Sequence, residues 1–445
     1  MATHNVFRSY DIRGIFNRDI SAEDAEKIGF VLASRAKSDI ILGMDMRSSS
    51  SMIKEKLSSG VMRAGFGVED VGLVPMGVAM FYAWKHGKAL AYVTASHLPK
   101  EWAGVKFFHA NGLGFSEKEN YAIRDEFFSI KKIINSKKAG NIEKKGSEEA
   151  IINYVSYLTA KLTPGKPLRV ALDCGNGMAS VAAKRLFEKA GFSVQTIYGD
   201  LRETPQRNSE PNIDPLTELR RSGADMGIAY DGDADRMILV DEKGSILTAE
   251  QSSYLILSQL ASEHKGDVVA NIECSLSMDD VAAAFHRKIH RQPVGHTFLV
   301  ENANERKACL GAESAGHYVI PPLLPFDDAL AVSLYAAVAL SRSSAPLSEI
   351  VKAVHRYPSG RVNFDCPDDK KFAIVEKLKN EFSGYNISTM DGLRIDFGDA
   401  WVLIRASNTS PMIRLTVEAK DEAAFERLTA EFKEVVENAI KGRYF

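Results

Sequence analysis

Residues 168–186 read LRVALDCGNGMASVAAKRL, and this stretch decides the fold class. The apolar run 168–172 has the length and composition of a buried β-strand. A glycine-containing turn, residues 173–177, follows it, and Val181 and Leu186 then mark the apolar face of a helix. A strand, a turn and a helix in this order are typical of an α/β domain.

The same alternation extends in both directions along the chain. Buried strands are expected at residues 40–42 and 89–93, and Ser21 with Asp24 predicts a capped helix start. A charged, apolar-poor stretch at 131–149 indicates a domain boundary. The sequence divides into four units, with predicted boundaries at 1–147, 148–247, 248–356 and 357–445.

Length and composition limit the class of protein. A chain of 445 residues, 26% charged and 45% hydrophobic, fits a globular protein of several domains. The 56 Lys and Arg against 58 Asp and Glu give a net charge of −2. We therefore expect no nucleic-acid partner, although a local basic groove stays possible. No segment has the roughly 20 apolar residues of a membrane span, so we expect no membrane contact.

The N-terminus and the cysteines favour a cytoplasmic location. Residues 1–13 are polar and contain no apolar signal core. The four cysteines lie far apart without a CxxC spacing, which argues against a zinc knuckle or a redox pair. Each is expected to be a small buried residue in a reducing compartment. They are Cys174, Cys274, Cys309 and Cys366.

An acidic segment, DGDADR at 231–236, is the first candidate site. In an extended segment, the carboxylates of Asp231, Asp233 and Asp235 would project to one side and repel one another unless a cation lay between them. Oxygen ligands select a hard ion, Mg²⁺ or Ca²⁺. Arg236 beside the acids suits an anionic substrate, which argues against a merely solvated turn.

An EF-hand calcium loop also begins D-x-D-x-D, and Glu242 falls at its twelfth position. The sixth position, however, is Arg236 where that loop needs glycine, and residues 237–240 resemble a strand. We therefore disfavour the EF-hand.

Ser96 follows the predicted strand 89–93 and precedes His97, with Lys106 downstream. It is either a strand-end cap or a nucleophile that carries a group, with His97 and Lys106 as proton or charge partners. A hydrolytic triad is disfavoured, because there is no G-x-S-x-G turn and an adjacent histidine is not expected to reach its neighbour's hydroxyl.

The segment RASNTSPMIR at 405–414 lies between two predicted strands. It is either a polar hairpin or a phosphate site, in which guanidinium groups and short neutral donors surround a dianion. The candidate ligands are Arg405, Ser407, Asn408, Thr409 and Arg414. The distance in sequence from the acidic segment suggests a substrate held between domains.

Together these segments resemble the α-D-phosphohexomutase family of phosphomannomutases, phosphoglucomutases and phosphoglucosamine mutases. The resemblance covers nearly the whole chain, and the motifs occur in the family's order. They are YDIRG at 10–14, TASHLP at 94–99, DGDADR at 231–236, VGHT at 294–297, GAESAGH at 311–317 and RASNTSPMIR at 405–414.

The resemblance implies a fold and a chemistry. The fold would be three mixed α/β domains and a smaller C-terminal α+β domain around a central active-site cleft. Ser96 would carry a phosphoryl group, and Mg²⁺ would be held by Asp231, Asp233, Asp235 and a phosphoserine oxygen. The phosphate of a hexose phosphate would bind the 405–414 loop, and its free hydroxyl would attack phosphoserine to give a 1,6-bisphosphate that turns end for end.

The resemblance also assigns roles to other side chains. Those expected to contact the sugar are Glu313, Ser314 and His317. Those expected to handle protons are Lys106, His97 and His296, while Arg13 and Arg236 would offset charge on the transferred group.

The sequence also departs from the family pattern, chiefly around the sugar loop. Leu98 stands where the family usually has Asn, and Ala312 and Ala315 stand where it usually has Gly and Ser. We expect a mutase of mannose phosphate, and of glucose phosphate as well, working as a monomer or homodimer. The alternatives are a phosphoglucosamine mutase, a non-catalytic sugar-phosphate-binding homologue and a Mg²⁺-dependent phosphatase.

Overall fold

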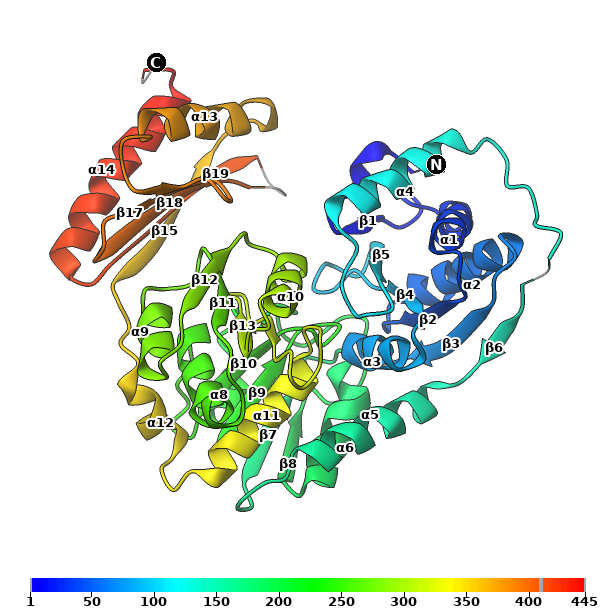
Figure 1. Ribbon diagram of the computed structural model, residues 1–445, viewed down its shortest axis with the longest axis horizontal. Coiled ribbons are helices and arrows are strands. Elements are labelled where there is room, and N and C mark those ends of the chain that lie inside the picture. The colour runs from blue at the N-terminus through cyan, green and yellow to red at the C-terminus, as the bar shows by residue number, and fades with distance from the viewer. Residues whose placement is uncertain (1, 139, 408–410, 444–445) are drawn as a thin grey trace.

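The computed structural model describes residues 2–138, 140–407 and 411–443, which form four domains in an arc (Figure 1). The N-terminal domain I and the C-terminal domain IV lie at the two ends of the arc, and domains II and III lie between them. The prediction of three mixed α/β domains followed by a smaller α+β domain is confirmed.

Domain I contains a six-stranded sheet in the order β1-β5-β4-β2-β3-β6. Strands β2, β3, β4 and β6 are parallel, while β1 and β5 run antiparallel to their neighbours. The strands are β1 Asp11–Ile15, β2 Ile40–Met44, β3 Val68–Leu73, β4 Ala89–Val93, β5 Trp102–Phe108 and β6 Ile142–Lys144. The helices are η1 His4–Val6, α1 Ala22–Ala36, α2 Ser48–Arg63, α3 Met76–His86 and α4 Glu117–Ser129. The predicted capping box at Ser21 and Asp24 is present at the start of α1.

Domains II and III each contain a four-stranded sheet, ordered β10-β9-β7-β8 and β12-β11-β13-β14. Domain II consists of α5 Ser147–Lys161, β7 Arg169–Asp173, α6 Ala179–Ala190, β8 Ser193–Ile197, α7 Thr217–Arg220, β9 Met226–Tyr230 and β10 Met237–Asp241. Domain III consists of α8 Ala249–Glu263, β11 Val268–Asn271, α9 Ser277–Ala284, β12 Ile289–Gln292, α10 His296–Glu305, β13 Leu310–Ala312, β14 Tyr318–Val319, α11 Ala329–Arg342, α12 Leu347–Ile350 and η2 Val351–Ala353.

Domain IV is an antiparallel sheet, ordered β15-β19-β18-β17-β16, packed against two helices. Its elements are β15 Ser359–Asp365, α13 Asp368–Glu381, β16 Ile387–Ser388, β17 Leu393–Asp396, β18 Ala400–Ala406, β19 Met412–Ala419 and α14 Glu422–Ile440. Its core is a separate cluster of buried side chains.

One continuous hydrophobic core joins parts of domains I, II and III. It includes side chains from α3 of domain I, α5 and α6 of domain II and α8 and α11 of domain III. Every residue of α11 up to Ser341 is buried, because its apolar and alanine-rich sequence is covered on all sides. These three domains therefore share a base from which the loops of the site project.

All four cysteines are free and buried, as predicted. No single helix in the described part of the chain is long and apolar enough to cross a membrane. The segments Ala329–Arg342 and Leu347–Ala353 taken together have the length and composition of a membrane span, but the chain bends by 90° between them.

Candidate active site

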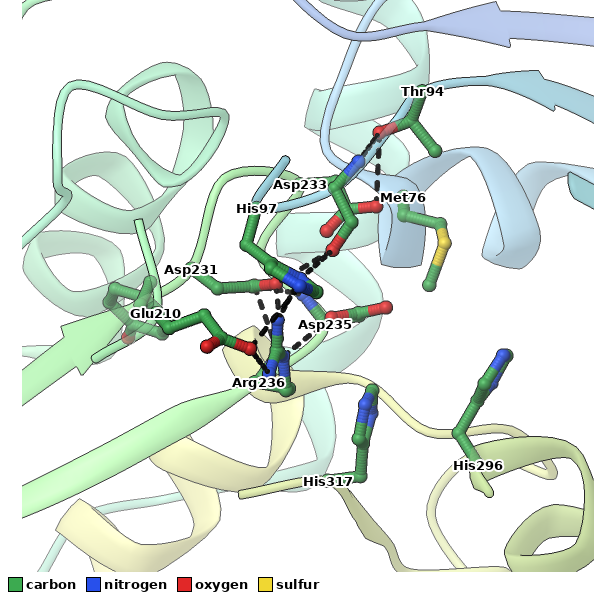
Figure 2. A network of polar contacts seen from close by, with 12 residues as sticks. Met76, Thr94, His97, Glu210, Asp231, Asp233, Asp235, Arg236, His296 and His317 are labelled. Carbon is green, nitrogen blue, oxygen red and sulfur yellow. Dashed lines mark hydrogen bonds and ion pairs between the residues drawn. The ribbon is translucent and has the colours of Figure 1, made fainter. Parts of the chain in front are cut away.

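Two loops from different domains meet at the site (Figure 2). The serine loop, residues 94–99, follows β4 of domain I, and the acidic loop, residues 231–236, joins β9 to β10 of domain II. A Cβ atom on Gly232 would lie 2.7 Å from the carbonyl oxygen of Ser96. The close approach of the two loops therefore requires glycine at this position.

Ser96 is buried, and its hydroxyl faces the acidic loop. Its amide donates to Thr94 Oγ1 at 2.8 Å, and the Thr94 hydroxyl donates to Asp233 Oδ2 at 3.1 Å. Ser96 Oγ lies 3.2 Å from Asp231 Oδ2 and 3.3 Å from Nδ1 of His97. The prediction that His97 cannot reach its neighbour's hydroxyl is wrong. Ser96 has a left-handed backbone, with φ at 52°, and this turn brings the two side chains together.

His97 is held in one tautomer by its neighbours. An Nη2–H of Arg236 donates to Nδ1 of the ring, so the ring proton lies on Nε2, which is 3.2 Å from Glu210 Oε1. Burial, and then the charge of Arg236, lower the pKa of His97 to about 4. The imidazole is therefore neutral near pH 7. Because Arg236 occupies Nδ1 of His97, His97 and Ser96 do not form part of a hydrolytic triad.

The three aspartates of the acidic loop converge, as predicted. One carboxylate oxygen from each of Asp231, Asp233 and Asp235 lies within 4.8 Å of the others, and all three side chains are buried. The loop is not extended as the sequence suggested: Ala234 takes a left-handed backbone with φ at 64°, and this tight turn brings the acids together.

This donor set fits a hard divalent cation. Asp233 Oδ1 and Asp235 Oδ1 are buried without a hydrogen-bond donor among the described residues. Arg236 Nε lies 3.9 Å from Asp235 Oδ1, beyond hydrogen-bond distance. Buried carboxylate oxygens without a hydrogen bond are costly unless a cation neutralises them. Burial and the neighbouring carboxylates raise the pKa of Asp231 well above its ordinary value, as expected for like charges held together. The EF-hand alternative fails, because Glu242 instead accepts hydrogen bonds from the amide and hydroxyl of Ser348.

Cationic side chains surround the acids. Lys106 Nζ, on β5, donates to Asp235 Oδ2 at 2.8 Å and to Asp233 Oδ2 at 3.3 Å. Burial opposes its charge, but these carboxylates raise its pKa above the ordinary value. Arg236 Nε donates to Asp231 Oδ2 at 3.2 Å. Arg13, on β1, is paired with Asp11 at 2.5 Å, and its charge reaches both Lys106 and His97.

The predicted sugar loop is the turn between β13 and β14. Glu313 is buried, and its Oε1 accepts a hydrogen bond from the amide of Gly295 at 2.8 Å, which ties this turn to the start of α10. Burial raises the pKa of the Glu313 carboxyl. Ser314 is exposed on the same turn.

His296 and His317 lie beside the acidic loop, with their rings stacked at 5.3 Å (Figure 2). Both Nδ1 atoms face Asp327 Oδ2, at 3.4 and 3.0 Å. The carboxylates of Asp235 and Asp327 outweigh burial and raise the pKa of His317. Asp327 was not predicted as a site residue, because the acidic pair 327–328 before the apolar run of α11 has the pattern of a helix cap, a role that Asp328 fills.

The predicted phosphate loop lies on domain IV. Arg405 and Arg414 are cross-strand partners on β18 and β19, as the sequence suggested, and Ser407 is buried beyond them. The other two predicted ligands of this loop, Asn408 and Thr409, lie outside the described residues. Arg414 is close enough for its charge to interact with Glu210 of domain II.

Arg405 also links domain IV to domain III. Its Nε donates to Asp391 Oδ1 at 3.0 Å, and its Nη1 donates to Glu273 Oε1 at 3.1 Å. The amide of Val294 donates to the other oxygen of Asp391. The predicted phosphate loop is therefore anchored beside the predicted sugar loop, and within the described part of the chain it forms no hydrogen bond or ion pair with Ser96.

Arg47 is a further residue that the sequence analysis did not assign to the site. Its guanidinium donates to the carbonyl oxygens of Leu98 at 2.6 Å and of Ser96 and Pro99 at 2.7 Å, and its Nε is paired with Asp45. One side chain thus satisfies three carbonyl groups of the serine loop. The available signal was an Asp-x-Arg directly after the strand β2.

We predict that Arg47→Met lowers kcat by about 10²-fold, because small misplacements of a reacting group cost that much, while KM changes little. Arg35→Met is the matched control, since Arg35 pairs with Glu126 at the surface. Activity assays and circular dichroism check this, and partial rescue of Arg47→Met by added guanidinium is expected. Unchanged kcat would show that the serine loop keeps its shape without Arg47.

The chain matches four family models along its length. They are phosphoglucomutase/phosphomannomutase α/β/α domain I at residues 4–134, domain II at 151–244, domain III at 248–357 and the C-terminal domain at 362–435.

Similar proteins match over almost their entire length. A "Probable phosphoglucosamine mutase" of Methanosarcina barkeri is 33% identical over 94% of this chain and 95% of that protein. A "Phosphoglucomutase/phosphomannomutase" of Thermococcus kodakarensis is 33% identical over 98% and 99%. A family protein of Burkholderia thailandensis has the same fold, with a TM-score of 0.88 at 24% identity, over 99% of this chain and 98% of that one.

These matches bear on two alternatives that the sequence left open, a mutase and a non-catalytic binding homologue. Relatives matched from end to end are named as mutases, which supports an enzyme and not a non-catalytic binding homologue. The chain belongs to the phosphoglucomutase/phosphomannomutase family, the α-D-phosphohexomutases.

Proposed function

We propose that this phosphohexomutase interconverts the 6-phosphates and 1-phosphates of mannose and glucose, with Ser96 as the phosphoryl carrier. One observation carries the proposal. The Ser96 hydroxyl lies 3.2 Å from Asp231 within a buried cluster of three carboxylates and two cations. Phosphoryl transfer needs mainly positioning and charge stabilisation, and this environment supplies both.

The proposed reaction consists of two phosphoryl transfers. A free hydroxyl of the sugar phosphate attacks the phosphorus on Ser96, so that a sugar O–P bond forms, the Ser96 O–P bond breaks and the hydroxyl loses its proton. The resulting 1,6-bisphosphate turns end for end. The Ser96 oxygen then attacks the other phosphate, the second sugar O–P bond breaks, and the released sugar oxygen regains a proton.

Asp231, Asp233 and Asp235, with an oxygen on Ser96, would hold Mg²⁺. When bound, this ion supplies charge stabilisation for the transferred group. Arg236 and Arg13 add positive charge next to the same position, and the burial of Arg236 keeps its charge poorly screened by water.

The protonation of the site supports a division of roles. Lys106 is held as an ammonium by Asp233 and Asp235. We therefore assign Lys106 to charge balance and not to proton transfer. His97 is neutral, and the ring of His296 stacks on that of His317 and faces Asp327. Nδ1 of His97 already accepts from Arg236 and its Nε2 carries the ring proton, so His296 is the candidate to take the hydroxyl proton.

The remaining assignments concern the substrate. Glu313, Ser314 and His317 would contact the sugar hydroxyls. The phosphate that is not being transferred would bind Arg405, Ser407, Asn408, Thr409 and Arg414. Glucose and mannose differ only at C2, and a bisphosphate that binds in two orientations is hard to discriminate at that carbon.

Glucosamine phosphate is the second candidate substrate. The names of several relatives favour it, including that of Methanosarcina barkeri. A buried carboxylate such as Glu313 can accept hydrogen bonds from an ammonium group as well as from a hydroxyl.

The test compares initial rates on the 1-phosphates of mannose, glucose and glucosamine with one enzyme preparation. We predict kcat/KM on mannose and glucose phosphates within about tenfold of each other, since a single epimeric hydroxyl is worth roughly 1 kcal/mol, and both above that on glucosamine phosphate. A higher kcat/KM on glucosamine phosphate would replace the mannose assignment. Release of free phosphate faster than isomer formation would indicate a phosphatase.

A further inference from the structure

A pocket of about 540 Å³ lies between domains III and IV. One wall comes from α9 and neighbouring residues of domain III, and the other comes from residues 386–398 and Lys420 of domain IV. Helix α9 lies on the side of domain III that faces away from domain I (Figure 1). The pocket is therefore separate from the serine and acidic loops.

The most unusual side chain in this pocket is Arg394, on β17. It is only 6% exposed, and its guanidinium stacks on Trp401 with 4.2 Å to the ring centroid. Its one hydrogen bond among the described residues is from Nη1 to the carbonyl oxygen of Ile272. No carboxylate of the described residues forms an ion pair with it, although it carries a full charge.

The other charged groups of the pocket each have a charged or neutral partner of their own, and Lys420 Nζ is paired with Asp399 Oδ1 at 2.9 Å. Arg291 is bonded to Asp279 and to three carbonyl oxygens. Asp280 accepts from the Tyr357 hydroxyl at 2.7 Å, and Asp396 accepts from the amide of Gly398 at 2.7 Å.

Arg394 thus presents unpartnered N–H donors to a pocket next to a second guanidinium. Burial, and then the nearby charge of Arg291, lower the pKa of Arg394 to about 10, and the carboxylates of Asp396, Asp279 and Glu418 offset only part of this shift. A buried cation next to another cation is destabilising, and an anion between them would relieve the repulsion. Guanidinium groups pair best with carboxylate and phosphate, and the volume suits a small metabolite.

We propose that this pocket binds a compact anion bearing a phosphate or carboxylate group, with Arg394 as the main contact and Lys420 at the rim. Because its two walls belong to different domains, a bound anion would hold domain IV against domain III. The proposal does not depend on which sugar the enzyme uses.

Inorganic phosphate is the probe, measured by titration calorimetry on the full chain at low salt, where ionic contacts are least screened. We expect two binding events in the wild type. Arg394→Met should weaken one of them about tenfold or more, as expected for the loss of a charge-assisted hydrogen bond. Arg405→Met should weaken only the other event, at the phosphate loop. Phosphate should also slow hydrogen exchange at residues 277–284 and 386–398.

Arg394 also bonds Ile272 across the domain interface, so a second variant is needed. Lys420→Glu reverses a rim charge without touching that bond, and it should weaken the same event roughly threefold. Lys441→Glu, on the same domain and paired with Glu437, is its control. A single event, lost in Arg405→Met and kept in Arg394→Met, would overturn the proposal, and so would an unchanged event in Lys420→Glu. Repeating the titration with malonate distinguishes a carboxylate site from a phosphate site.

Discussion

Replacing Ser96 with alanine is expected to lower mutase activity by about five orders of magnitude or more, the scale seen when a covalent nucleophile is removed. The loss should appear in kcat, because the sugar and phosphate contacts proposed for domains III and IV stay intact. The folded chain should keep its stability. The two acceptors near the Ser96 hydroxyl, Asp231 and Nδ1 of His97, both also accept hydrogen bonds from the guanidinium of Arg236. Removing the hydroxyl therefore leaves neither of them without a donor.

Two measurements check this expectation. A coupled assay gives the activity, and intact-protein mass spectrometry after incubation with a hexose 1,6-bisphosphate should show one added phosphate on the wild type and none on Ser96→Ala. Ser253→Ala is the matched control, because Ser253 is fully buried and its hydroxyl has no partner among the described residues. Residual activity within tenfold of wild type would show that another group carries the phosphate.

Much of the fold was predictable from local patterns. The capping box before α1, the glycine turn after β7 and the alternating strands of domain IV follow from periods and turn residues that act within about ten positions. The C-terminal helix Glu422–Ile440 has an amphipathic pattern that lies wholly within the segment. Predictions of this kind succeed because the physical cause lies inside the segment.

The sharing of one core by three domains was not predictable in the same way. The apolar helix α11 shows in sequence only that it is buried, not which domains cover it. The sequence pattern therefore indicated four separate units, whereas in the structure a shared hydrophobic core joins three of them. Such contacts depend on residues more than a hundred positions apart, as between Tyr154 and Asp328.

The site shows the same division. Ser96 and the three aspartates stand next to strand ends, where functional side chains concentrate, and sequence analysis found them. Glu210 lies in a long loop without periodic pattern. Its contact with Arg236 lies within domain II, and its contact with His97 depends on the approach of domains I and II. The close contact of Ser96 with His97 depends on a single left-handed residue, which no local pattern indicated.

Asp233→Asn is expected to separate metal binding from folding. Asp233 is fully buried, with Oδ2 bonded to Thr94 and Lys106 and Oδ1 unpartnered among the described residues. Removing its charge should lower activity by about 10³-fold, since charge stabilisation of a transferred group is worth several kcal/mol. Chelation should inactivate the wild type, and added Mg²⁺ should restore it.

The second readout is thermal stability, which does not depend on turnover. Any ion that binds only the folded chain raises its melting temperature, so Mg²⁺ should raise the Tm of the chelated wild type. Asp233→Asn should lose most of that increase, while its Tm without metal should equal or exceed the wild-type value, because one of three mutually repelling carboxylates is gone. Asp241→Asn, a buried acid at the end of β10 that accepts the amides of Lys243 and Ser245, should keep the full increase. An equal Mg²⁺ response in Asp233→Asn and the wild type would mean that the ion binds elsewhere, and the charge assigned to the acidic loop would then have to be balanced by Lys106 and Arg236 alone.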